Sequence, residues 1–248
     1  MKTPPQRQVL SVQGPATGTA GQIAGTLLIV ATLWIVSSEG YYAIVDAGGL
    51  ADGYDGAPLL FTAYYLGWAA IAAFMFRGLF AQVLSRDRIA REGLALIPIL
   101  AAFGLFVVYL LPLLPSVSEL RAPANPPEFM FATAWYYLPK SADILFQQVL
   151  VAALILTGWR AGFGLKMLSI SLGVAFGLFH LGLAFDGFLW LYVARFTLAA
   201  TLFGMLLPYL YLRLRSGFRY AYSLHWGFYA ADAILTHILL AAPPWAQG

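Results

Sequence analysis

Long runs of apolar residues follow one another along this chain, separated by short polar turns. We predict helices at about 23–45, 57–76, 93–114, 142–159, 167–185, 187–212 and 219–241. Most are close to the roughly 20 residues that a helix needs to cross the hydrocarbon core of a bilayer. The pattern therefore predicts an all-α polytopic integral membrane protein with about seven transmembrane helices.

The chain before the first apolar run is polar and contains several Pro and Gly residues. We expect residues 1–19 to form a flexible cytoplasmic tail and residues 20–248 to form a single membrane domain. The run at 23–36 could also be the core of a signal peptide, with a possible cleavage site at Val36-Ser37-Ser38. Because apolar residues resume at 41–45, a retained first helix is the favoured interpretation.

Composition supports the membrane assignment. Hydrophobic residues make up 61% of the chain and charged residues only 10%, whereas about 25% of a typical soluble protein is charged. The net charge of +3 would suggest nucleic acid in a soluble chain, but cationic loops beside a membrane explain it better, so we expect no nucleic-acid partner. The chain has no cysteine, which excludes disulfides, thiol catalysis and cysteine metal sites.

The positive charges fall into alternate turns. One set of turns holds Lys2, Arg7, Arg77, Arg86, Arg88, Arg91, Arg160, Lys166, Arg213, Arg215 and Arg219. The opposite set holds only Arg121 and Lys140, together with most of the acidic residues. Because cytoplasmic loops carry an excess of Lys and Arg, we predict a cytoplasmic N-terminus and an outside C-terminus.

The longest connection, 115–141, joins a Pro-rich stretch to the aromatic run from Phe129 to Tyr137. We expect it to lie at the outer face, as a membrane anchor or packing surface. The alternative is a lid or a surface that docks a partner.

Several ionisable or strongly polar residues fall within the predicted spans, where each costs free energy unless it has a partner. They are Asp143, Gln147, Gln148, His180, Arg195, His225, Asp232 and His237. We expect Asp143 to be hydrated in the first turn of its helix, and His237 to lie at the outer interface. Arg195 and Asp232 are expected to neutralise each other between the last two helices.

The remaining four residues are two glutamines and two histidines on three helices. Gln147 and Gln148 could join helices by hydrogen bonds. His180 and His225 suggest a metal, a proton path or a buried polar network.

The order and spacing of these residues resemble the CPBP family of intramembrane CAAX proteases and bacteriocin-processing proteins. Its second motif, Phe-x-x-x-His, is present as Phe176 to His180. Its third, His-x-x-x-Asn, has His225 but Tyr229 in place of Asn. Its first, Glu-Glu-x-x-x-Arg, aligns with Gln147, Gln148 and Ala152. The resemblance covers about 140–240, the predicted helices 4–7, and implies a bacterial cytoplasmic membrane.

The departures argue against the family's chemistry. The resemblance implies a glutamate that activates water, and a glutamine amide cannot accept that proton. We therefore expect no catalytic residues and no cofactor in this chain. Because Gln has the shape of Glu, the intramembrane cleft of the family could persist without its charge. We expect Gln147 or Gln148, His180 and His225 to face one common cleft.

These observations favour a catalytically degenerate CPBP-like protein, a pseudoenzyme that binds membrane lipids, a hydrophobic ligand or a partner helix in that cleft. Two alternatives remain. One is an active peptidase in which zinc binds His180 and His225, with Asp232 as a possible carboxylate. The other is a small transporter or proton-coupled carrier.

The charge pattern generates the first testable prediction. Topology reporters fused after Arg88 and after Gly248 should report opposite sides of the membrane, because an odd number of predicted spans, those from 93–114 to 219–241, lies between the two fusion points. Activity of both reporters on the same side would show that the number of crossing helices is wrong.

Overall fold

A computed structural model describes residues 19–50, 53–83, 86–122, 128–185 and 187–241. The long helices are α1 (Ala20–Gly48), α2 (Pro58–Met75), α4 (Arg86–Leu105), α5 (Tyr137–Arg160), α6 (Leu165–Leu181), α7 (Trp190–Arg213) and α8 (Gly217–Leu239). A short helix, α3 (Arg77–Val83), follows α2. The described residues form no β-strand, only one isolated bridge between Val117 and Ala241.

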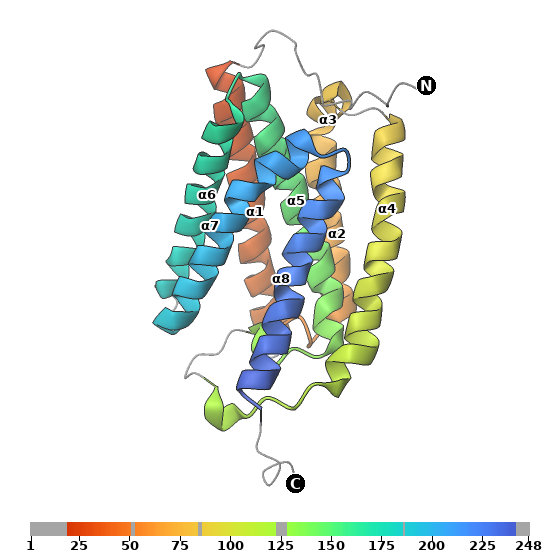
Figure 1. Cartoon of the computed structure of the whole chain (residues 1–248), viewed down its shortest axis with the longest axis vertical. Coiled ribbons are helices and arrows are strands. Elements are labelled where there is room, and N and C mark those ends of the chain that lie inside the picture. Colours follow the sequence, from red (N-terminus) through yellow and green to blue (C-terminus); the bar gives the residue numbers. More distant parts are fainter. Residues whose placement is uncertain (1–18, 51–52, 84–85, 123–127, 186, 242–248) are drawn as a thin grey trace, which may run out of the picture.

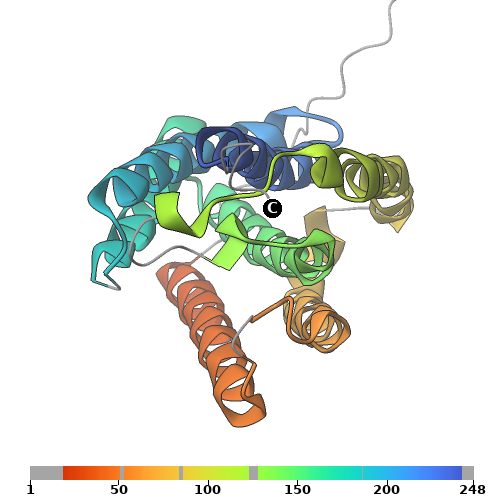
Figure 2. The ribbon, with the colours of Figure 1, turned by 90° about the horizontal axis from the view of Figure 1, so that it is seen from below.

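The long helices form an up-and-down bundle around α5 (Figure 1). Seen from below, α5 lies between the α1–α2 pair and a curved row made of α6, α7, α8 and α4 (Figure 2). Ile144, Leu150, Ala153 and Ile155 of α5 have no exposed surface. The central helix is therefore the one against which the others pack.

The all-helical prediction agrees with this architecture, and the helix positions agree closely with the predicted spans. Within the described part of the chain, six helical segments are long and apolar enough to cross a membrane; α8 does not meet that criterion. Two details of the prediction were wrong. The turn expected after the second span contains α3, and the span expected at 142–159 begins earlier, at Tyr137. Of the predicted tail, 1–18 lies outside the described residues.

Local signals in the sequence set the ends of several elements. Thr19 and Gln22 form a capping box at the start of α1: each side chain accepts a hydrogen bond from the other residue's backbone N–H. Gly49 ends the helix in the left-handed conformation, with φ of 61°. Beyond α4, the chain widens into a π-helical turn at Phe106–Leu110, just before Pro112.

The segment 115–141 closes one end of the bundle. It contributes the 3₁₀ turns Glu119–Arg121, Glu128–Met130 and Ala134–Tyr136 before entering α5. Phe129 is buried against the rings of Phe196 and Tyr229. The described part of this segment is thus a packing surface inside the fold, one of the roles expected for it.

Helices α6 and α7 approach each other closely because small residues face each other. A Cβ atom added at Gly204 would lie 2.7 Å from the backbone oxygen of Leu172, and one at Gly177 would meet the hydroxyl of Thr201. Small residues permit this backbone approach in membrane helix pairs.

This contact gives a prediction. Gly204→Ala should destabilise the protein by about 1–3 kcal/mol, because a methyl group forced against backbone must separate α6 from α7. Gly67→Ala is the matched control, since no atom lies within 4 Å of its added Cβ, and the better helix propensity of Ala favours that variant. Thermal unfolding in detergent would measure both; equal midpoints for the two variants would contradict the packing argument.

Candidate functional site

A cavity of about 790 Å³ lies between α1, α5, α6, α7 and α8. Pockets that hold small ligands are typically of this size, about 300–1,000 Å³. Of the residues singled out in the sequence, Gln147, Phe176, His180, His225 and Tyr229 all line this cavity. Three separate helices, α5, α6 and α8, therefore contribute a glutamine, two histidines and a tyrosine to one cavity.

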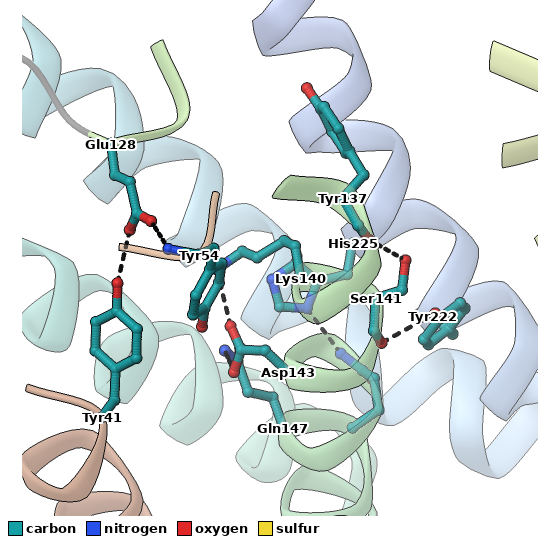
Figure 3. A network of polar contacts seen from close by, with 11 residues as sticks. Tyr41, Tyr54, Glu128, Tyr137, Lys140, Ser141, Asp143, Gln147, Tyr222 and His225 are labelled. Atoms are coloured by element: carbon teal, nitrogen blue, oxygen red, sulfur yellow. Dashed lines mark hydrogen bonds and ion pairs between the residues drawn. The ribbon is translucent and has the colours of Figure 1, made fainter. Parts of the chain in front are cut away.

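The first turns of α5 carry a ladder of polar groups along the cavity (Figure 3). Lys140 Nζ donates to Asp143 Oδ2 at 2.8 Å, and Gln147 Nε2 donates to Asp143 Oδ1 at 2.8 Å. The three residues lie on one face of the helix because they are spaced by three and four positions. Asp143 thus satisfies both carboxylate oxygens within α5. Only 6% of its surface is exposed, so the expectation of a hydrated residue was wrong.

Aromatic rings surround the ammonium group of Lys140. Its Nζ lies 4.5 Å from the ring centroid of Tyr229 and 5.8 Å from that of Tyr54, distances at which a cation is attracted to a ring face. Sequence analysis placed Lys140 in an outer turn. It lies instead in the first turn of α5 and faces the cavity.

A carboxylate from the closing segment completes this end of the cavity. Glu128 accepts hydrogen bonds from the backbone N–H of Tyr54 and from the hydroxyl of Tyr41 (Figure 3). The residue is exposed, but its carboxyl end is turned inward, and this burial raises its pKa. The hydrogen bonds from Tyr54 and Tyr41 act in the opposite direction. Burial also raises the pKa of the Tyr54 hydroxyl.

Gln148 lies beside the cavity rather than in its lining, fully buried between α5, α7 and α8. Its amide nitrogen lies 3.1 Å from His225 Nδ1, and its amide oxygen accepts from the Tyr211 hydroxyl at 2.8 Å. Since an amide nitrogen can only donate, His225 Nδ1 is the acceptor and its proton is on Nε2. Gln148 is therefore hydrogen-bonded to His225, and Gln147 to Asp143.

His180 makes its bond within its own helix. Its Nδ1–H donates to the backbone oxygen of Phe176 at 2.9 Å, and its ring stacks on Phe196. Ala152, which the expected resemblance would align with an arginine, is buried among apolar residues such as Leu156 and Leu172.

The residues present do not fit a zinc site. Among the residues that the structure describes, no three His, Asp or Glu side chains come together. Asp232, considered as a possible third ligand, forms an ion pair with Arg195 at 2.7 Å and is absent from the cavity lining. A catalytic zinc site generally uses three protein ligands. The predicted pairing of Arg195 with Asp232 is confirmed by this geometry.

His237, expected at the outer interface, bonds to the closing segment. Its Nδ1–H donates to the backbone oxygen of Pro115 at 2.7 Å. It fastens the end of α8 to that segment and takes no part in the cavity.

Sequence reasoning missed the charged end of the cavity. The pair Lys140 and Asp143 could have been found from its i, i+3 spacing at the start of an apolar helix. The contributions of Tyr41, Tyr54 and Glu128 could not, because three separate segments bring them together.

Comparison with known proteins gives no further identification. No protein-family model matches the chain, and no curated protein or solved structure is detectably similar to it.

The buried amide generates a prediction. Gln148→Leu should destabilise the fold by about 1–3 kcal/mol, because it leaves His225 Nδ1 buried without a donor. Gln147→Leu is the control and should destabilise the fold less, since Gln147 is only partly buried and Asp143 would still form its ion pair with Lys140. Thermal unfolding of the purified proteins measures the difference. A larger loss for Gln147→Leu would mean that the Gln148–His225 bond is not important for stability.

Proposed function

We propose that this chain is an integral membrane protein that binds a hydrophobic ligand in the cavity between α1 and α5–α8, without catalysing a reaction. The observation that carries the proposal is a ligand-sized cavity whose strongly polar groups are already bonded to one another.

The outer surface supports a membrane location. Large apolar side chains are exposed on the outward faces of α1, α4, α6 and α7. Examples are Leu28, Leu94, Leu178 and Leu191, each more than 60% exposed. A soluble monomer rarely exposes apolar surface on this scale, whereas lipid tails cover it without cost.

We propose that α8 crosses the membrane as well, as a seventh span. Its sequence is less apolar because it carries His225 and Asp232, and both have partners within the bundle. Polar residues in membrane helices almost always face the interior in this way. In Figure 1, α8 crosses in front of α5, and the two helices are in contact.

The orientation follows from the cationic turns. The C-terminal ends of α2, α5 and α7 lie at one end of the bundle, at the top of Figure 1. This end carries Arg77, the first residue of α3, and Arg160 and Arg213, the last residues of α5 and α7. We propose that this end is cytoplasmic. The end closed by 115–141 then faces outward.

Binding is favoured over cleavage because both carboxylates among the described lining residues are already hydrogen-bonded. Asp143 accepts from two side chains, and Glu128 from a hydroxyl and a backbone N–H. The glutamines at 147 and 148 have no basicity. This is the state that the resemblance to the CPBP family would leave if its cleft were kept and its reaction lost.

The proposal is tested by filling the cavity. Ala175 lines it, so Ala175→Trp should occupy part of its volume. Native mass spectrometry of protein purified in mild detergent should show a retained lipid-sized molecule on the wild type and at least a tenfold lower occupancy on this variant.

Ala102→Trp is the matched control. Ala102 is exposed on α4 and takes no part in the lining, so its occupancy should equal that of the wild type. Equal occupancy in all three proteins would contradict the proposal, because the bound molecules would then lie elsewhere on the surface.

A further inference from the structure

The lining of the cavity changes from polar to apolar along its length. On α5 the lining residues are, in order, Lys140, Asp143, Phe146, Gln147, Leu150, Val151 and Leu154. They form one stripe along the helix, since they repeat at three- and four-residue intervals. At a rise of 1.5 Å per residue, the stripe from Lys140 to Leu154 is about 21 Å long.

Helix α1 presents the same gradient in the opposite sequence direction. Its lining residues Tyr41 and Ser38 lie towards its C-terminal end, and Leu27 and Val30 lie towards its start. The two helices are antiparallel (Figure 1), so the polar ends coincide. The Thr26 hydroxyl lies 3.2 Å from that of Thr157 and joins them at the apolar end.

Helices α6 and α8 follow the same division, whereas the lining residues of α7, from Phe196 to Leu206, are apolar throughout. On α6, His180 lies at the polar end and Leu172 lies deeper in the cavity. On α8, Tyr229 lies beside Lys140, whereas Leu224 lies towards the opposite end. The cavity is therefore amphipathic as a whole, with one polar end beneath the closing segment.

The polar end carries no spare positive charge. The ammonium of Lys140 is paired with Asp143 at 2.8 Å. Glu128 adds a carboxylate whose pKa is raised by burial. An anionic ligand would find no free cation there, and a cationic ligand would have to compete with Lys140 for the aromatic faces and Asp143.

Groups suited to an uncharged head are present. Gln147 gives its N–H to Asp143, which leaves the amide oxygen as an acceptor. The hydroxyl-bearing rings of Tyr41, Tyr54 and Tyr136 also line this end. A buried site of this kind favours a ligand whose polar atoms it can bond without a counter-ion.

Resting on the proposed function, we infer that the cavity takes an uncharged amphiphile: a hydrocarbon chain with a hydroxyl- or carbonyl-bearing head. Its head lies beside Gln147 and the tyrosines, and its chain extends along Leu150, Leu154 and Leu172.

Three probes with the same tail test this inference: 1-oleoylglycerol, oleyl sulfate and oleyltrimethylammonium. Titration of each into the full-length protein in detergent, followed by native mass spectrometry, should give at least tenfold tighter binding of 1-oleoylglycerol. Tighter binding of the ammonium probe would identify an aromatic cation site instead. Tighter binding of the sulfate would show that Lys140 is free to bind an anion. Either result overturns the inference.

Two variants sharpen the test. Gln147→Leu should weaken the binding of 1-oleoylglycerol by about three- to tenfold and leave the binding of 1-octadecene, which has no polar head, unchanged. Equal effects on the binding of both probes would overturn the inference. Lys140→Met leaves Asp143 without its cation and should shift preference towards the ammonium probe. If that variant does not fold, Gln147→Leu and the three probes still decide.

The same titration separates this inference from the proposed function. Equal affinity for all probes, abolished by Ala175→Trp, would keep the cavity as the binding site and reject the uncharged head. Binding of all probes that Ala175→Trp does not affect would reject the cavity itself.

Discussion

The character of the cavity depends on one ion pair, between Lys140 and Asp143 in the first two turns of α5. A single buried charge in an apolar helical bundle is costly, and a partner at 2.8 Å offsets part of that cost. The pair is held further by Gln147 on one side and by the rings of Tyr54 and Tyr229 on the other. Removal of either charge would leave the other without a counter-ion at the head of the cavity.

The central position of α5 explains why this pair influences so much of the molecule. The same helix supplies the stripe from Lys140 to Leu154 and, on an adjacent face, Gln148, which joins α7 and α8 through Tyr211 and His225. A shift of α5 along its axis would disturb both sets of contacts. On the other side of the cavity, α6 and α7 pack closely against each other through Gly177 and Gly204.

The sequence was sufficient for the helices but only partly for the site. Apolar runs of membrane length locate helices well, because each run is a local property. The partnership of Arg195 with Asp232 could also be predicted, since two opposite charges in neighbouring apolar helices have few other partners. The position of Lys140 was misjudged because the start of α5 is aromatic and follows a Pro-rich loop. The end of a helix depends on what packs on it, and here the ring of Tyr136 packs on that of the buried Tyr137 in the first turn of α5.

The surroundings of positions 147 and 148 explain why neutral glutamines fit there better than glutamates. Among the described residues that line the polar end, the carboxylates of Asp143 and Glu128 outnumber the one cation, Lys140. A glutamate at 147 would add a third carboxylate there, and one at 148 would place a further charge beside His225, so the repulsion would force protonation or require a bound cation. Amides of the same shape keep the hydrogen bonds to Asp143 and His225 without that repulsion. Neutral residues at these two positions therefore allow Lys140, Asp143 and a ligand-sized cavity to occur together in one apolar bundle.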